Sequence, residues 1–267
     1  MPSRKNEISV PWPFAPDRVD LNQDTSLLKL IAIVTMFCDH AGKMLFPQYR
    51  VMRIIGRIAF PIYAYCIAAG MVYTRDSLKY LTRVVLLALI SQPIYAVALD
   101  HTIPAMFSVS FREAPIKALW TFYLNSWNHP CILATLAVGI CVIWTIRNRH
   151  LILTAGLLLL SWKISSGLDY GLRGVGLMVL FYLFVGKWWL SLPVMAAYMT
   201  WWGTLSGVYT VSAFGFTFSY GIQMYAILAL IPIYIHTHTG IRINKWVFYS
   251  FYPLHLAAIL LLDRFVF

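Results

Sequence analysis

The sequence predicts an all-α protein folded as a polytopic transmembrane helical bundle. The chain has 267 residues and is 60% hydrophobic, and its mean hydropathy of +0.70 lies outside the usual balance of soluble domains. Apolar segments of helical length recur from Leu27 to the C-terminus. They lack the alternation of apolar and polar residues that is typical of an outer-membrane barrel. We therefore expect about nine membrane spans, within a range of about eight to ten.

Each expected span is long enough, or nearly so, to cross a hydrocarbon core of about 30 Å. The spans are expected at 27–46, 52–73, 78–99, 131–147, 150–166, 171–187, 188–206, 218–236 and 246–264. The segments after Cys131 define the helices least sharply, which is why the expected number covers a range.

The chain is expected to form one membrane domain, 27–267, behind a short polar lead, 1–26. The lead contains Arg4, Lys5 and several prolines but no apolar h-region, so no cleavable signal is visible. The first span is therefore expected to act as the targeting element and to stay in place. No internal repeat is evident.

The longest interruption between spans is the stretch 100–130. It is rich in aromatic residues and also contains Arg112, Glu113 and Lys117. Aromatic side chains at this density predict a loop or tilted helix lying at the membrane interface. A loop of this length is often a lid over a substrate site, and an irregular connector is an equally favoured interpretation.

The orientation follows from the charges of the short connections. The connections after the second, fourth and eighth spans are basic, whereas 207–217 carries no charge. By the positive-inside rule the N-terminus is cytoplasmic. Four basic residues then lie on the outer side against this rule, which predicts a local role for them: Lys43, Arg50, Arg53 and Arg57.

The net charge of +11 does not by itself identify a binding partner. Much of it serves orientation and attraction to anionic lipid head groups. Nucleic-acid binding is not expected, because the charges are scattered between spans. The four cysteines lie inside apolar segments without metal-type spacing, so they are interpreted as small buried hydrophobes and no metal is expected. Self-association is compatible with this composition.

The first span carries the most informative cluster, which consists of Lys29, Asp39 and His40. Ionisable groups at membrane depth are costly and usually face a protein interior or a wet cavity. Lys29 lies eleven positions before His40, so both are on nearly the same helix face, about 16 Å apart. Histidine exchanges protons near neutral pH. Asp39 points about 100° round the helix and is expected to pair with Lys43 or with an arginine of the second span. The alternative is a polar cluster that only fixes helix packing.

The second span contains Arg53 and Arg57, one helical turn apart on one face. Pro61 is expected to bend this helix and to free a carbonyl inside the bundle. Gly56 and Gly70 allow close approach of a neighbouring helix or ligand. Two arginines beside a kink suit an anionic or carbonyl ligand, and interfacial snorkelling of both is the alternative.

A third cluster surrounds the connection from the second to the third span. Arg75 and Arg83 would face the cytoplasm at the level of Lys29 and form a basic mouth able to hold phosphates. Gln92 would lie deeper and donate to a carbonyl. The alternative for the two arginines is that they only satisfy the orientation rule.

Two further candidates lie in the second half of the chain. Asp169 and Tyr170 precede Gly171, and Asp169 is interpreted equally as a helix N-cap. His255 ends a Phe-Tyr-Pro-Leu-His run at 251–255, which predicts a helix bend just before it. By itself His255 is ambiguous between a core histidine and a site residue.

These motifs together resemble the TraX family of bacterial membrane proteins. The resemblance rests on Leu-Lys-x-Ile-Ala…Met-x-x-Asp-His-x-Gly, Arg-x-Ile-Gly-Arg-Ile-Ala-Phe-Pro-Ile, Thr-Arg…Tyr-x-x-Arg…Ile-Ser-Gln-Pro, Asp-Tyr-Gly and Phe-Tyr-Pro-Leu-His, in this order. The family's namesake is associated with N-terminal acetylation of a conjugative pilin. The family is also similar to acyltransferase-3 type membrane enzymes, which carry a basic residue, ten spacers and a catalytic histidine in their first span. Lys29 and His40 match that spacing.

The resemblance implies a multi-pass acyltransferase of the bacterial inner membrane that uses acetyl-CoA as the donor. Coenzyme A would enter from the cytoplasm, with Lys29, Arg75, Arg83 and Gln92 as its binding residues. His40 would be the general base and Asp39 would orient the site.

Arg53 and Arg57 would stabilise the oxyanion or position the acceptor, together with Asp169, Tyr170 and His255. Direct transfer and a histidine-bound acyl intermediate both remain open. The acceptor is expected to be a pilin-like N-terminus, an envelope sugar or a small molecule.

Two other classes remain as alternatives. In a transporter or flippase the same charges would line a permeation path, although the chain shows no paired repeats or matched broken helices. An assembly or scaffold subunit would leave His40 without a chemical role.

Overall fold

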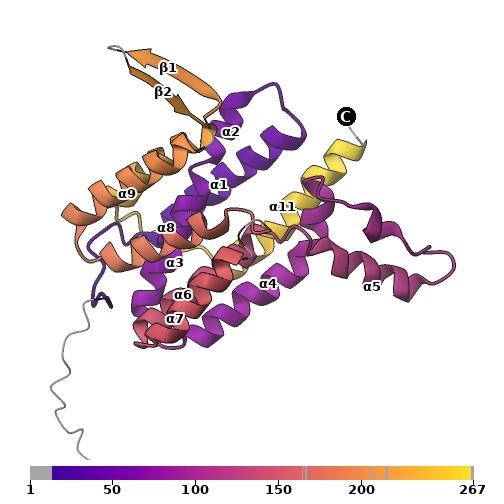
Figure 1. The fold of residues 1–267 in the computed structure, drawn as a ribbon, viewed down its shortest axis with the longest axis horizontal. Helices are drawn as coiled ribbons and strands as arrows, with labels where there is room; N and C mark the ends of the chain where they lie inside the picture. Colours follow the sequence, from indigo (N-terminus) through magenta and orange to yellow (C-terminus); the bar gives the residue numbers. More distant parts are fainter. Residues whose placement is uncertain (1–13, 164, 166, 206, 214–215, 266–267) are drawn as a thin grey trace, which may run out of the picture.

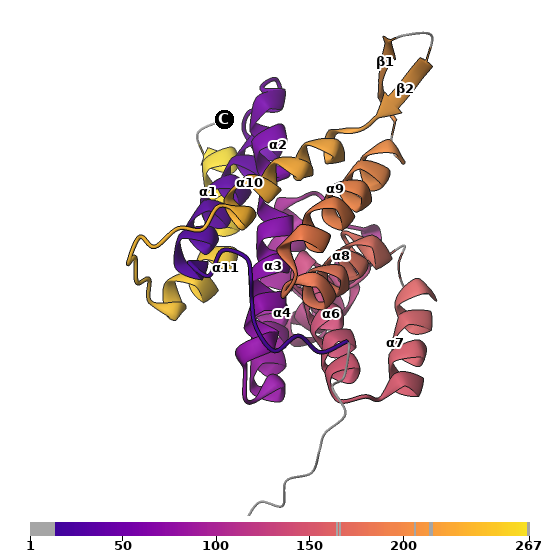
Figure 2. The same ribbon diagram turned by 90° about the vertical axis from the view of Figure 1, so that its left-hand side faces the viewer.

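The protein is helical, as predicted, and its computed structural model describes residues 14–163, 165, 167–205, 207–213 and 216–265 (Figures 1 and 2). The first half contains α1 (Thr25–Met44), α2 (Arg50–Gly56), α3 (Ala59–Tyr73), α4 (Ser77–Ala98), a short 3₁₀ helix η1 (Pro104–Phe107) and α5 (Pro115–Ser126). The second half contains α6 (Ile132–Arg147), α7 (Leu151–Lys163), α8 (Gly171–Phe184), α9 (Trp188–Thr204), η2 (Ile222–Ala229), α10 (Leu230–Tyr234) and α11 (Lys245–Phe265).

Within the described residues, four helices are long and apolar enough to cross a membrane. They lie at Thr25–Met44, Arg50–Tyr73, Ser77–Ala98 and Trp246–Phe265, close to the first three expected spans and the last one. Shorter apolar helices occupy Ile132–Arg147, Leu151–Lys163, Gly171–Phe184 and Ile222–Tyr234. The total of about nine spans and the cytoplasmic N-terminus stay predictions.

The second long helix is interrupted at Arg57 and Ile58, between α2 and α3. Pro61 has no N–H to donate to the carbonyl of Arg57, four residues earlier, so the helical hydrogen bond to that carbonyl is missing at this interruption. Pro61 itself lies in the first turn of α3, where a missing N–H costs little. The expected kink is therefore present but is displaced towards Arg57.

Pro93 lies inside the continuous helix α4 and also leaves a carbonyl without its helical partner. That carbonyl belongs to Leu89, and the hydroxyl of Tyr123 donates to it over 3.1 Å. Since Tyr123 belongs to α5, this bond joins the two helices.

The aromatic stretch expected at the interface forms η1 and α5, and α5 projects from the bundle (Figure 1). Its exposed side chains include Ile116, Leu119, Trp120 and Leu124. Apolar side chains on a projecting helix fit the predicted interfacial position.

One prediction of helix was wrong at its beginning. The segment 218–236 begins in a two-stranded antiparallel hairpin, with β1 (Tyr209–Ala213) paired to β2 (Phe216–Tyr220) and Tyr209 opposite Tyr220. Aromatic and β-branched residues alternate with small polar ones here, which favours strands over a membrane helix. The uncharged segment 207–217 lies mostly in this hairpin.

The described part of the polar lead packs against the bundle instead of extending away from it. The backbone N–H of Asn22 donates to Ile233, and the hydroxyl of Tyr65 in α3 donates to the Asn22 carbonyl over 2.6 Å. Asp24 caps α1 by accepting from the Leu27 N–H. Hydrogen bonds from Thr239 to Asp24 hold the pKa of that carboxyl below its usual value.

Helix α3 forms the centre of the fold. It packs against α1, α6 and α8, and the side chain of Tyr65 lies fully buried against Phe181 of α8. Helix α11 crosses back to pack against α1 and α4. The first and last long helices, α1 and α11, therefore pack against each other.

Candidate functional site

A cavity of about 640 Å³ extends along α1 and is also walled by α3, α4 and α11. Apolar and aromatic side chains form much of its lining. Most of the residues selected from the sequence also line it: Lys29, Asp39, His40, Arg53, Arg57, Arg83, Asp169 and Tyr170. Because α1 rises about 1.5 Å per residue, Lys29 and His40 mark positions about 16 Å apart on the cavity wall.

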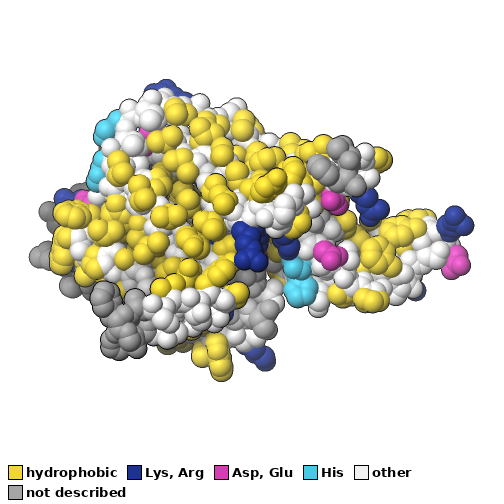
Figure 3. Space-filling model, turned by 90° about the horizontal axis from the view of Figure 1, so that it is seen from above, with side chains coloured by type: hydrophobic (Ala, Val, Ile, Leu, Met, Phe, Trp, Pro, Cys, Tyr) yellow, Lys and Arg dark blue, Asp and Glu magenta, His cyan; other side chains and the backbone are white. Residues whose placement is uncertain are grey.

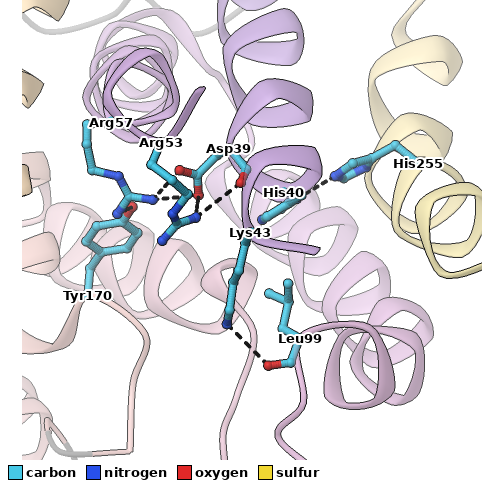
Figure 4. Close-up of polar contacts among 8 residues, drawn as sticks. All are labelled: Asp39, His40, Lys43, Arg53, Arg57, Leu99, Tyr170 and His255. Carbon is cyan, nitrogen blue, oxygen red and sulfur yellow. Dashed lines mark hydrogen bonds and ion pairs between the residues drawn. The ribbon is translucent and has the colours of Figure 1, made fainter. Parts of the chain in front are cut away.

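Asp39 forms ion pairs with both arginines of the second long helix. Its Oδ2 lies 2.8 Å from Nη1 of Arg53, and Nη2 of Arg57 donates to both carboxylate oxygens. The Asp39 side chain therefore points away from His40 (Figure 4). Asp39 was expected to pair with Lys43 or with an arginine of the second span, and the structure shows it paired with Arg53 and Arg57.

Gly56 makes this arrangement sterically feasible. A Cβ atom at position 56 would clash with the Cβ and carboxyl group of Asp39. Residue 56 is the last residue of α2 and lies between the two arginines in sequence. The absence of a side chain at this point lets α1 and α2 approach closely enough for the ion pairs to form.

We expect Gly56→Ala to lower stability, because α2 must move away from Asp39 to admit the methyl group. A Gly156→Ala variant is the matched control, since nothing lies within 4 Å of a Cβ at that position. Thermal unfolding in detergent should show a destabilisation of about 1–3 kcal/mol for Gly56→Ala and little change for Gly156→Ala. Equal unfolding midpoints for the two variants would contradict this account of Gly56.

His40 contacts a second histidine, His255 of α11. The Nδ1 atom of His40 lies 2.7 Å from Nε2 of His255, and the two ring planes lie within 14° of parallel with centroids 5.0 Å apart. The other nitrogen of His255, Nδ1, lies 2.7 Å from the carbonyl oxygen of Phe251. His255 is buried and does not line the cavity. It reaches His40 from the neighbouring helix (Figure 4).

Tyr170 and Asp169 approach the arginines from the turn before α8. Nη1 of Arg57 donates to the Tyr170 hydroxyl over 3.2 Å, and the Tyr170 ring stacks on Phe60. Asp169 does not cap α8, whose N-cap residue is Tyr170. Burial raises the pKa of the Asp169 carboxyl, and the nearby cations Arg57 and Lys43 oppose that shift.

Cationic side chains gather at the opposite end of the cavity. Lys29, Lys79 and Arg83 all line it there. The Lys29 ammonium lies 5.7 Å from the ring centroid of Phe248 in α11, a cation–π arrangement. Lys79 also pairs with Asp76 over 3.1 Å.

Two expected cofactor residues lie outside this cavity. Arg75 lines a separate small pocket beside Arg147. The Gln92 amide is occupied by the backbone, because its Nε2 donates to Ser126 and His129 and its Oε1 accepts from Cys131. Gln92 therefore fastens the α5–α6 connection to α4.

The sequence interpretation did not select Tyr252, which lines the cavity three residues before His255. Its hydroxyl is buried and has no hydrogen-bond partner among the described residues. A buried donor without a partner is costly and fits a cavity that receives an acceptor atom from a ligand. The Tyr-Pro-Leu-His run was the only sequence signal for this residue.

No metal centre is evident in the part of the chain that the structure describes, where no group of three or more metal-ligating side chains occurs. Seen from above, hydrophobic side chains cover most of the bundle, while basic, acidic and histidine side chains gather where the bundle meets the projecting region (Figure 3).

The long apolar helices and the cavity with its internal ion pairs define a membrane-associated protein with a polar site enclosed by helices. Comparison with known families then identifies it further. The chain belongs to the TraX family. The model of this family, described as TraX protein, matches residues 24–263.

Two curated proteins are similar to the chain. The probable fimbrial assembly protein FimC, serogroup H1, of Dichelobacter nodosus is 24% identical over 254 residues, which cover 87% of this chain and 92% of that protein. An uncharacterized protein of Rickettsia prowazekii (strain Madrid E) is 29% identical over 161 residues, 58% of this chain and 53% of that protein. No solved structure matches the chain.

Proposed function

We propose that the protein is a multi-pass acyltransferase of the bacterial inner membrane that transfers an acetyl group from acetyl-CoA to an amine or hydroxyl acceptor. The observation that carries the proposal is that one and the same cavity is lined by Lys29, Lys79 and Arg83 at one end and by His40 at the other. A cavity of about 640 Å³ falls within the size range of small-molecule sites.

The cationic end would hold the phosphates of coenzyme A by charge-assisted hydrogen bonds. Arg75 is left out of this role because it lines another pocket, and Gln92 is left out because its amide is already hydrogen-bonded. The N-terminus is proposed to be cytoplasmic, so this end faces the cytoplasm and His40 lies toward the outer side.

At the other end His40 would act as general base. It takes the proton of the acceptor N–H or O–H as the acceptor atom attacks the thioester carbonyl, and it returns that proton to the leaving thiolate. The products are the acylated acceptor and free coenzyme A, so the histidine ends neutral.

The carbonyl oxygen gains negative charge during this attack and needs donors. The unpartnered hydroxyl of Tyr252 is one donor that lines the cavity. Arg53 and Arg57 are already paired with Asp39, so they supply a fixed positive field beside the acceptor. Asp39 holds these two cations in place.

The acceptor class is supported by the relative named as a probable fimbrial assembly protein. A pilin-like N-terminal amine is therefore the acceptor we propose to test first, ahead of envelope sugars and small molecules. Such an acceptor would reach the cavity from the outer side.

The test uses purified protein in liposomes with acetyl-CoA labelled in the acetyl group. We expect release of free thiol together with transfer of label to a peptide that carries a free N-terminal amine. The same peptide with a blocked N-terminus is the control. Movement of intact label across the membrane without thiol release would instead support a transporter, and label retained on the protein would indicate an acyl-enzyme.

A further inference from the structure

His255 has a chemical environment that fixes which of its nitrogens carries hydrogen. Its Nδ1 lies 2.7 Å from the Phe251 carbonyl oxygen (Figure 4 shows the His255 ring). A carbonyl can only accept, so Nδ1 of His255 must be the donor. In neutral imidazole the second nitrogen then has a lone pair and accepts.

The same reasoning passes to His40. Nε2 of His255 lies 2.7 Å from Nδ1 of His40 (dashed in Figure 4), so Nδ1 of His40 must carry the hydrogen of this bond. Neutral His40 is then left with its lone pair on Nε2. Among the described residues no hydrogen bond reaches Nε2 of His40, whereas the His40 side chain lines the cavity.

We propose that His255 is a positioning residue that holds His40 in the tautomer with the basic lone pair on Nε2, directed at the acceptor. The proposal rests on the proposed acyl transfer. When His40 takes the acceptor proton on Nε2, its Nδ1–H stays donated to His255, and no proton leaves the pair. His255 itself touches neither the acceptor nor the thioester.

The stacking geometry suggests a clean way to remove this bond. His255 lies parallel to Phe251, with centroids 4.8 Å apart, and meets His40 edge to edge. Phenylalanine at position 255 keeps a flat ring beside Phe251 but offers no acceptor to His40. Glutamine places an amide oxygen near the former Nε2 position and can still accept from His40.

The test combines two readouts on the full chain in lipid nanodiscs. Nitrogen NMR of ¹⁵N-histidine protein at a pH of about 8, where ordinary imidazoles are neutral, reports the tautomer of each ring, and the His40 signals are assigned from a His40→Ala sample. We expect His40 to be protonated on Nδ1 in the native protein and in His255→Gln. In His255→Phe this single tautomer should be lost.

Acetyl transfer is the second readout. His255→Phe should lower kcat by about tenfold or more with little change in the KM for acetyl-CoA, because the His40 ring is then no longer held in the tautomer with a basic Nε2. His255→Gln should recover most of this loss. His238→Phe is the control, since His238 is exposed and lies outside the cavity lining.

Native His40 protonated on Nε2 would overturn the proposal, as would a His255→Phe variant that keeps the native tautomer and rate. The NMR result does not depend on turnover. If the native protein releases no coenzyme A, the proposed function fails while the tautomer is still decided. Equal unfolding midpoints for His255→Phe and the native protein establish that a lost rate is not a folding defect.

Discussion

Replacing His40 by alanine should reduce acetyl transfer by about 10²- to 10⁴-fold, the range that a positioned general base contributes. His40 and His101 both occur in the described part of the cavity lining, and the variant removes the one that is hydrogen-bonded to a second histidine. Binding of acetyl-CoA should persist, because Lys29, Lys79 and Arg83 are unchanged at the other end. Single-turnover kinetics separates this loss of the chemical step from a loss of binding.

The control for this prediction is His238→Ala, which removes an exposed imidazole outside the cavity lining. It should transfer acetyl groups at the native rate. A His40→Ala protein that releases coenzyme A as fast as the control would rule out His40 as the base. A loss of acetyl-CoA affinity without a fall in the single-turnover rate would assign His40 to binding.

Replacing Asp39 by alanine should produce the largest loss of stability. The side chains of Asp39 and Arg57 are each 11% exposed, and that of Arg53 is 28% exposed. Removing the carboxylate leaves two neighbouring cations without their counter-charge, and breaking a buried pair in this way costs about 3–5 kcal/mol. Chemical or thermal unfolding in detergent measures the change.

An exposed ion pair provides the comparison. Arg18 pairs with Asp20, but the Arg18 side chain is 72% exposed, so Arg18→Ala should change the unfolding midpoint little. A triple variant, Asp39→Leu with Arg53→Met and Arg57→Met, removes all three charges together. It should be more stable than Asp39→Ala and still inactive. If Asp39→Ala unfolds like Arg18→Ala, the ion pairs do not hold these helices together.

The sequence was most informative where a single helix carries the signal. The spacing of Lys29 and His40 follows from helix geometry alone, and both residues line one cavity. The 100° offset of Asp39 likewise anticipated that its side chain turns away from His40. The long first, second, third and last spans were predicted from continuous apolar runs within a few residues.

Contacts between distant segments were not predictable in the same way. The bond between His40 and His255 depends on how α11 packs against α1, which no local pattern encodes. Gln92 was expected to bind a ligand, but its side-chain amide is hydrogen-bonded to the backbone of the α5–α6 connection. The β1–β2 hairpin was missed because an apolar segment was interpreted by its hydropathy instead of its strand-forming residues.

The lead segment has a consequence for how the chain is made. Thr239 donates to Asp24, the N-cap residue of α1, and His40 contacts His255. Each of these two contacts joins residues that lie 215 positions apart in the sequence. At translation rates of about 5–20 residues per second, the first helix waits on the order of ten seconds or more for these partners. During that interval Asp24 and His40 must be satisfied by lipid head groups, water or insertion machinery. Maturation of the site is therefore tied to the arrival of α11, because until then His40 has no His255 to donate to.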